Sequence, residues 1–367
     1  MASDSRPSTS PPASGLPLSD AERGAGGEVR VAIIGLGNVG RRVLRILHDK
    51  RTFFRDRHGL EFLVTGAADS KGAAWTPDGL DLKRLIGLKE MKDTAASCLG
   101  AGHRGASGLE MLRNAGADVL VEASPVNLKD GEPGMSHVRQ ALEQGMHVVT
   151  ANKAPLALAF PEIMALARER GQRVLFSATV GGGLPAVNIG VRDLCHARVE
   201  RLEGVVNLTS HFILTHMGRG YTYQEALTLA RKAGHAEPDP TLDVDGWDAA
   251  NKLVILANSV LGFPARLTDV RVAGIRGINR TMLAHAREHG NVILPLAVAE
   301  KWNDGYRLSV QPTEVDGDHP LASLTGDQMG IVYYTDTKGV VTAIVDEIDP
   351  MPTAGAVVRD LINLYRE

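Results

Sequence analysis

The segment of this 367-residue chain that is richest in reactive side chains is GHAEPDPTLDVDGWDAANK, residues 234–252. Asp248 and Lys252 are four residues apart and share one face of a helix, which Asp245-Gly246 is expected to cap. The residues around them, from Trp247 to Ala257, are mostly apolar. On a surface helix the pair would be a minor ion pair, but a buried helix carries charges only when they are paired or used. The segment is therefore a candidate active site.

A glycine-rich turn is the second chemical signal. Gly35-Leu-Gly37-Asn-Val-Gly40 follows an expected strand over residues 31–34 and opens an amphipathic helix. The first glycine permits a tight turn, the second lets the backbone approach a pyrophosphate, and the third permits close packing of helix on strand. The start of the helix adds free N–H groups for phosphate oxygens. The pattern predicts a dinucleotide site.

The adenosine end of that site is expected at Asp69, directly after a strand over residues 62–68. A carboxylate at this place would accept hydrogen bonds from the ribose hydroxyls, or it would serve only to cap the loop. Ser70 and Lys71 follow, and a lysine here suits a 2′-phosphate. The residues leave the choice between NAD and NADP open.

The elements that must position these groups change in type near residue 180. Before it, strands alternate with helices, which favours a parallel sheet wound on both faces; after it, the pattern is α+β with a mixed or antiparallel sheet. The fold class predicted is α/β, a doubly wound parallel sheet plus an α+β domain. Expected strands cover residues 31–34, 62–68, 118–122, 147–150, 173–177, 199–208, 292–299, 306–311, 330–334 and 340–345, and expected helices 136–144, 160–170, 186–194, 223–232, 246–261 and 353–362.

Composition limits the partners. A net charge of −3 argues against nucleic acid and anionic membranes, and no apolar run approaches the roughly 18–20 residues that span a bilayer. Only Cys98 and Cys195 occur, without a C-x-x-C motif, so we expect neither disulfides nor a zinc site, which fits a reducing cytoplasm. Residues 1–28 are rich in Ser, Pro and Gly and are expected to be a disordered tail.

Three motifs in order give the chain a family resemblance. The segment DVDGWDAANK, the ANK of residues 151–153 and the VGGGLP of residues 180–185 resemble homoserine dehydrogenase, and the likeness covers residues 29–364. It implies NAD(P)-dependent interconversion of L-homoserine and L-aspartate 4-semialdehyde, a step in threonine, methionine and isoleucine biosynthesis. It also implies a homodimer, a Rossmann-type domain over 29–180 completed by a helix over 350–367, and a substrate-binding and dimerisation domain over 181–349. The chain resembles the short form, without a C-terminal regulatory domain.

The resemblance also implies roles for individual residues. Lys252 and Lys153 face the reacting oxygen, Asp248 and Asp243 bind the substrate amino group and orient Lys252, and Glu237, Thr209 and His235 line the substrate. Cofactor contacts fall on Gly35, Gly37, Asn38, Val39, Gly40, Asp69, Ser70, Lys71, Ser124, Pro125 and Lys153. Two neighbouring lysines are expected to lower one another's pKa. Some members bind a monovalent cation, Na⁺ or K⁺, through backbone carbonyls, which leave no side-chain signature; no side-chain metal ligands are expected.

Two residues depart from the family pattern and leave alternative functions open. The family pattern resembles NGTTNYIL where this chain reads NLTSHFIL over residues 207–214, so Leu208 and His211 stand near the substrate. A non-catalytic NAD(P)-binding sensor, or a relative with an altered substrate, is the alternative function.

A thiol-dependent dehydrogenase would need Cys195 and His196 as a pair, but adjacent helix residues point about 100° apart, and Cys195 is expected to be packed.

Overall fold

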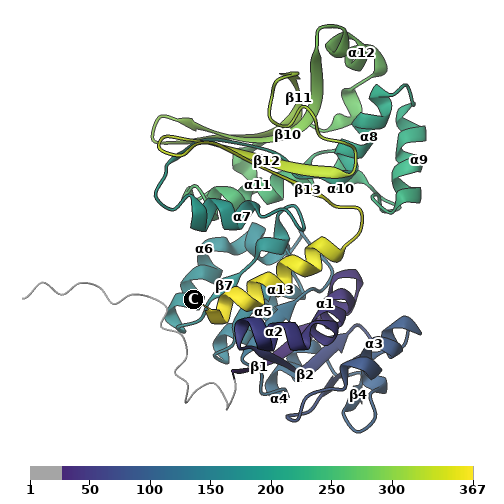
Figure 1. Ribbon diagram of the computed structural model, residues 1–367, viewed down its shortest axis with the longest axis vertical. Helices are drawn as coiled ribbons and strands as arrows, with labels where there is room; N and C mark the ends of the chain where they lie inside the picture. Colours follow the sequence, from purple (N-terminus) through teal and green to yellow (C-terminus); the bar gives the residue numbers. More distant parts are fainter. Residues whose placement is uncertain (1–26, 367) are drawn as a thin grey trace, which may run out of the picture.

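The computed structural model describes residues 27–366 and contains two sheets, one above the other in Figure 1. We call the seven-stranded sheet with its helices the first lobe and the six-stranded sheet with its helices the second lobe. This confirms the predicted fold class. Of the expected tail, residues 1–26 lie outside the described residues, and Glu28 already belongs to the first strand. Within residues 27–366, no helix is both long and apolar enough to cross a membrane.

The first lobe is built on strands in the order β4-β3-β2-β1-β5-β6-β7. The strands β2, β1, β5, β6 and β7 pair in parallel, and the apolar residues of β1 and β5 are buried because helices cover both faces, whereas those of the edge strand β7 are half-buried. Two short antiparallel strands, β3 and β4, extend the edge and were not expected from the sequence. The strands are β1 Glu28–Ile34, β2 Glu61–Asp69, β3 Gly72–Trp75, β4 Gly102–Arg104, β5 Val119–Glu122, β6 His147–Thr150 and β7 Val174–Leu175.

Helices of the first lobe correct one expectation and add one element. Before β2 the chain forms a helix, α2, that was not expected from the sequence. Helix α6 begins at Ala154, well before the expected residue 160, because Pro155 fits its first turn and the chain continues through a non-helical Ala159 ahead of Pro161. The helices are α1 Asn38–Asp49, α2 Arg51–His58, α3 Leu82–Glu90, α4 Gly108–Asn114, α5 Gly134–Glu143 and α6 Ala154–Glu169, with a short 3-10 turn Ala95–Ser97.

The second lobe contains a mixed sheet in the order β13-β12-β8-β10-β11-β9, antiparallel except where β9 joins β11. One face packs on α11, which lies between the sheet and the first lobe. The strands are β8 Val199–Val205, β9 Val270–Val272, β10 Asn291–Trp302, β11 Gly305–Asp316, β12 Gln328–Thr335 and β13 Gly339–Asp346. The helices are α7 Ala186–Asn188, α8 Leu208–Gly218, α9 Tyr223–Ala233, α10 Thr241–Val244, α11 Trp247–Ser259 and α12 Arg280–Glu288, with a π-turn Ile189–Asp193 and 3-10 turns Leu267–Asp269 and Ile275–Gly277. A further 3-10 turn, Ser177–Thr179, belongs to the first lobe.

The expected strand over residues 199–208 was wrong at its end. The strand β8 stops at Val205, and Leu208 begins helix α8, whose first turn is capped by the Asn207 side chain through a 2.9 Å bond from the Ser210 N–H. Helix α8 is buried on almost every side, so its sequence carries no helical period that would separate it from the strand before it. The expected cap of α11 also differs: Gly246, with φ 87°, precedes the helix without any side-chain bond.

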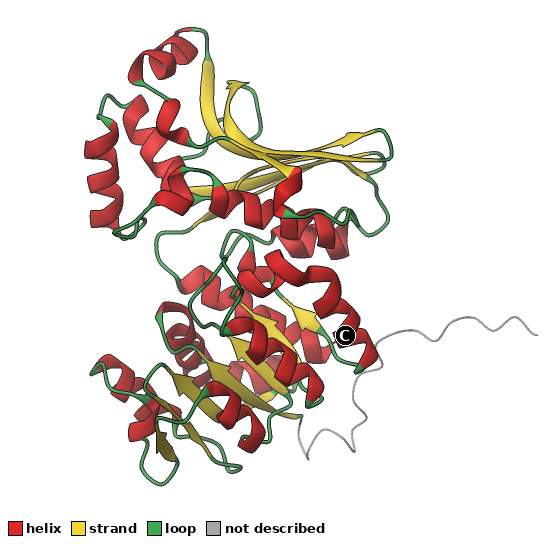
Figure 2. Cartoon of the chain, turned by 180° about the vertical axis from the view of Figure 1, so that it is seen from behind, coloured by secondary structure: helices red, strands yellow, loops and turns green. Residues whose placement is uncertain are grey.

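The chain ends in helix α13, Met351–Arg366, which returns from the second lobe to pack on the first (Figure 1; Figure 2 gives the opposite view). Its apolar face joins α1 and β1 in one core. The buried Asp360 carboxylate accepts bonds from both the N–H (2.8 Å) and the hydroxyl (2.7 Å) of Ser177. Helix α13 therefore packs as part of the first lobe.

Candidate active site

The glycine turn has the geometry of a dinucleotide cradle. At Gly35 an added Cβ would lie 2.2 Å from the Ala123 carbonyl oxygen, and at Gly40 2.0 Å from the Gly35 carbonyl oxygen, so both positions require glycine. At Gly37 an added Cβ would meet nothing within 4 Å, and that backbone faces open space. Helix α1 starts there without a side-chain cap, which leaves N–H groups for an anion.

A cavity of 540 Å³ opens in front of this cradle, at the carboxyl ends of β1, β2 and β5. Glu237 reaches it from the second lobe, so the cavity touches both lobes. Almost every residue expected to contact the cofactor lies in its wall: Gly35, Gly37, Asn38, Val39, Asp69, Ser70, Lys71, Ser124 and Pro125. A dinucleotide therefore fits the residues present, and these lining residues would bind it.

Asp69 is engaged within the protein. Its two oxygens accept bonds from Lys89 Nζ (2.6 Å), the Thr94 hydroxyl (2.8 Å), and the N–H groups of Lys71 (2.9 Å) and Ala95 (3.0 Å). Burial acts to raise the pKa of Asp69, but the bonds from Lys89 and the backbone outweigh it, so this pKa lies below its usual value. The carboxylate thus organises the loop after β2, whatever it contributes to ribose binding.

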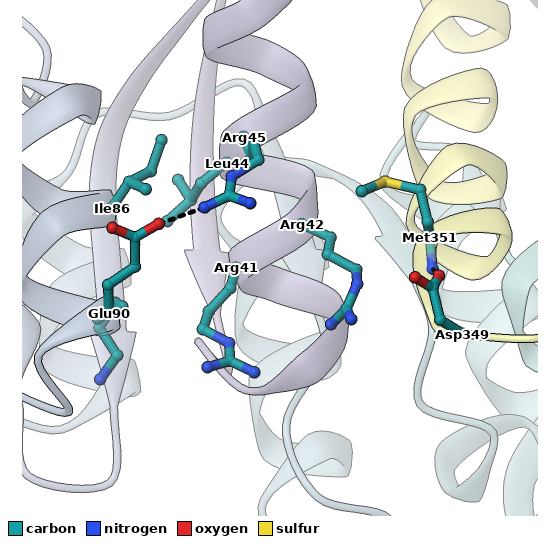
Figure 3. A pocket seen from close by; sticks show the side chains of 9 residues that line it. Arg41, Arg42, Leu44, Arg45, Ile86, Glu90, Asp349 and Met351 are labelled. Atoms are coloured by element: carbon teal, nitrogen blue, oxygen red, sulfur yellow. Dashed lines mark hydrogen bonds and ion pairs between the residues drawn. The ribbon is translucent and has the colours of Figure 1, made fainter. Parts of the chain in front are cut away.

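Arginines of α1 line a second pocket that shares one residue with the dinucleotide cavity. Arg41, Arg42 and Arg45 line a 310 Å³ pocket next to Lys89, and Figure 3 shows Arg45 paired with Glu90 across it. Lys89 lines this pocket and the dinucleotide cavity alike. The positive charge near the start of α1 favours an anionic cofactor.

The acid–lysine cluster expected from the sequence is assembled around Asp248. Its Oδ1 lies 2.6 Å from Lys153 Nζ, which comes from the loop before α6, and its Oδ2 lies 2.7 Å from Lys252 Nζ on the next turn of α11. Lys252 also donates to the Val206 carbonyl at 2.7 Å. Asp248 is only 6% exposed. Residues from two lobes therefore form one buried ionic group.

The electrostatics of this cluster correct the expectation that the lysines lower one another's pKa. Burial acts to lower the pKa of Lys153, but the adjacent Asp248 carboxylate outweighs it and raises this pKa above the usual value. Burial likewise acts to raise the pKa of Asp248, and the two ammonium groups drive it far below the usual range. Lys153 therefore carries its positive charge while Asp248 is bound to it.

Asn207 was missed as a site residue. Its side-chain N–H₂ donates to Asp248 Oδ2 and to Asp243 Oδ1, both at 2.7 Å, while its oxygen caps α8. Burial raises the pKa of Asp243, and the neighbouring Asp248 charge adds to the effect. The sequence signal was an N-cap residue ahead of an apolar helix, a position that the mistaken strand obscured.

The other residues expected to bind the substrate make no direct contact with the Asp248 cluster among the bonds described. Glu237 is exposed, and its negative charge contributes to the raised pKa of Lys153. Thr209 is buried and donates its hydroxyl to the His235 carbonyl, and the His235 ring contacts Asp327 at 3.0 Å. Both therefore shape the second lobe through internal bonds. Cys195, expected to be packed, is exposed. Within residues 27–366, no three His, Cys, Asp or Glu side chains are grouped to bind a metal ion.

Comparisons with known proteins cover both lobes. The family model for homoserine dehydrogenase matches residues 185–362, and that for the homoserine dehydrogenase NAD binding domain matches residues 35–177. Homoserine dehydrogenase of Methanocaldococcus jannaschii is 35% identical over 91% of this chain and 98% of its own length. These matches span the cradle, the cluster and both sheets.

Solved structures agree. A putative homoserine dehydrogenase from Archaeoglobus fulgidus has a TM-score of 0.82 and 35% identity, covering 92% of this chain and 99% of that one. A hyperthermophilic archaeal homoserine dehydrogenase in complex with NADPH has a TM-score of 0.78 and 28% identity, covering 92% and 97%. The chain belongs to the homoserine dehydrogenase family of NAD(P)-dependent oxidoreductases.

Proposed function

We propose that this chain interconverts L-homoserine and L-aspartate 4-semialdehyde at the Lys153–Asp248–Lys252 cluster, with NAD(P) in the neighbouring cavity. The observation that carries the proposal is Asp248, which joins one lysine from each lobe beside the dinucleotide cradle. A protein that only sensed a dinucleotide would have no use for two lysines held on one buried carboxylate. The same observation disfavours a sensor.

The lysines suit the chemistry of the reacting oxygen. NAD(P), when bound, accepts hydride from the alcohol carbon or returns it to the aldehyde. Charge develops on the substrate oxygen during that transfer, and an ammonium group stabilises it and supplies a proton. Lys252 donates to the Val206 carbonyl and to Asp248, which uses two of its three N–H donors, so the third is available to this oxygen. Lys153, anchored on Asp248 Oδ1, approaches from the first lobe.

Carboxylates bind the substrate ammonium in this proposal. Asp243 is half-buried beside another acid, so its raised pKa reflects an unfavourable negative charge that a substrate ammonium would relieve. Glu237 offers a second carboxylate at the junction with the cofactor cavity. Thr209 and His235 support this wall through their internal bonds. Asp248 orients both lysines rather than the substrate.

We further propose a cytoplasmic homodimer. Strand β13 is the outer strand of the six-stranded sheet, and two of its apolar residues, Val340 (57%) and Ile344 (43%), are exposed. An unpaired sheet edge with apolar side chains is a common site of self-association. Sedimentation of the wild type against Ile344→Lys tests the dimer: a monomeric wild type would refute it. The proposed lobe boundaries and a backbone-bound Na⁺ or K⁺ rest on the family likeness alone.

The function is tested by initial rates of L-homoserine oxidation with NAD⁺ and NADP⁺ in parallel. Lys252→Ala is compared with Lys301→Ala, which removes only an exposed ion pair with Glu200. We expect turnover in the wild type and in Lys301→Ala, and loss of turnover in Lys252→Ala with dinucleotide binding intact. A wild type that binds a dinucleotide but turns over no amino-acid alcohol would support the sensor instead.

A further inference from the structure

A buried carboxylate at the carboxyl edge of the first sheet has no role in the chemistry above. Glu122 is the last residue of β5 and is fully buried, between Ile34 of β1 and Thr150 of β6. A carboxylate at this depth costs several kcal/mol of solvation unless donors surround it. Its partners therefore indicate what it stabilises.

Glu122 bonds to two elements that flank the cofactor cavity. Its Oε2 lies 2.8 Å from Nδ1 of the buried His137 on α5. Its Oε1 accepts from the Ser124 N–H at 2.8 Å and from the Ser124 hydroxyl. Ser124 and Pro125 form part of the cavity wall. Glu122, itself bonded to His137, thus holds the Ser124–Pro125 part of the cavity wall from its buried side.

The chain of bonds continues to Lys153. The Asn152 side-chain N–H₂ donates to Ser124 Oγ (3.3 Å) and to the Pro125 carbonyl (3.4 Å), and its oxygen accepts from the Ala154 N–H (3.0 Å). Lys153 lies between the two residues so bonded and occupies the N-cap of α6. The hydrogen bonds of Asn152 therefore fix the position of the Lys153 backbone. The position of Asn152 is fixed in turn by Ser124, which is bonded to Glu122.

We propose that Glu122 and His137 are positioning residues that fix the cofactor wall and the Lys153 backbone as one rigid unit. They touch neither cofactor nor substrate, and they act through Ser124 and Asn152. The inference deepens the function proposed above and rests on Lys153 as a participant in that reaction. A displacement of about 1 Å at a reacting group is enough to lower a rate by about a hundredfold.

The chain contains a matched control for burial alone. Asp360 is also fully buried and also accepts from the N–H and hydroxyl of one serine, Ser177. It belongs to α13 and lines neither the cofactor cavity nor the lysine cluster. Glu122→Gln and Asp360→Asn each remove one buried charge with little change of shape, so they separate positioning from stability.

The experiment measures kcat, homoserine KM, the dinucleotide Kd and the deuterium isotope effect on kcat with homoserine labelled at the reacting carbon. We expect Glu122→Gln and His137→Leu to lower kcat by about tenfold to a hundredfold. Both variants should also raise the dinucleotide Kd by about threefold and increase the isotope effect, while the homoserine KM changes little. His137→Asn retains a donor near the Nδ1 position and should recover most of kcat. Asp360→Asn should lower the melting temperature without changing these constants.

The outcomes are separable. The proposal would be overturned if Glu122→Gln had the same kcat and dinucleotide Kd as Asp360→Asn. It would also be overturned if the kcat of His137→Asn were no higher than that of His137→Leu. If His137→Leu fails to fold, Glu122→Gln and His137→Asn still decide. Absence of turnover in the wild type would count against the proposed function. Comparison of the dinucleotide Kd of Glu122→Gln with that of Asp360→Asn would then still test whether Glu122 fixes the cofactor wall.

Discussion

Lys153 of the first lobe and Asp248 of the second form an ion pair of 2.6 Å across the junction of the lobes. Asp248 bonds Lys252 of its own helix through the other oxygen. Each oxygen of this buried carboxylate faces an ammonium group, so its negative charge is compensated and the three groups together carry one net positive charge. The site is complete only when both lobes contribute, so their relative position is part of the catalytic geometry.

Asp248→Asn should therefore change the pH dependence as well as the rate. Asp248 raises the pKa of Lys153, so removing its charge lowers that pKa. Reduction of the semialdehyde needs a protonated lysine, and its loss on the alkaline side should begin at lower pH in the variant. We expect kcat to fall by about a hundredfold. The measurement is the pH–rate profile of the reductive reaction, with exposed Asp239→Asn as control; an unmoved alkaline limb would contradict the assignment.

The sequence predicted the groups that are close in the chain. Asp248 and Lys252 share a helix turn, and the glycines of residues 35–40 form a local turn, so spacing alone placed them. Partners brought together by tertiary structure were not predictable from one sequence. Asn207 reaches Asp248 only because the start of α8 lies near the first turn of α11, and Lys89 reaches Asp69 only because the end of α3 lies near the end of β2. Lys153 was placed by the family motif, not by spacing.

Asp69 should matter for stability. Its removal by Asp69→Ala leaves Lys89, which is largely buried, without its carboxylate partner, and leaves three further donors unsatisfied. We expect a loss of about 3 kcal/mol in the free energy of unfolding. Glu90→Ala, which removes only the exposed pair with Arg45, should cost less than about 1 kcal/mol. Urea denaturation measures both, and equal losses would show that Asp69 is not a structural carboxylate.

His211 should make the protein sensitive to acid. Its Nε2 lies 2.8 Å from the Thr325 carbonyl and its Nδ1 is buried without a partner, so burial lowers the pKa to about 4. The unfolded chain binds this proton from about pH 6.5 downward, so the stability is complete above that pH and is lost as pH falls toward 4. We expect His211→Asn to lessen this acid loss by about 3 kcal/mol. The exposed His196→Asn should have no such effect on unfolding measured between pH 7 and 4.

Glu237 should act on substrate affinity. It is exposed at the junction of the lobes and its charge faces Lys153. If it binds the substrate ammonium, Glu237→Gln should raise the homoserine KM by about tenfold, the value of one charged hydrogen bond, with a smaller change in kcat. Asp239→Asn, two residues away and exposed, provides the control. Equal KM values in the two variants would remove Glu237 from the substrate site.

Lys71 should govern cofactor discrimination. Its side chain is exposed in the wall of the dinucleotide cavity, and only its backbone N–H is bound to Asp69. Because the oxygens of Asp69 already accept four bonds, the carboxylate has little capacity left for ribose hydroxyls, and a nearby ammonium favours a 2′-phosphate. Lys71→Ala should therefore raise the KM for NADP⁺ by about tenfold while the KM for NAD⁺ changes little. The ratio of kcat/KM for the two cofactors, in the variant against the wild type, measures this directly. A loss that is equal for both cofactors would place the lysine elsewhere, because only NADP⁺ carries the phosphate that it is expected to bind.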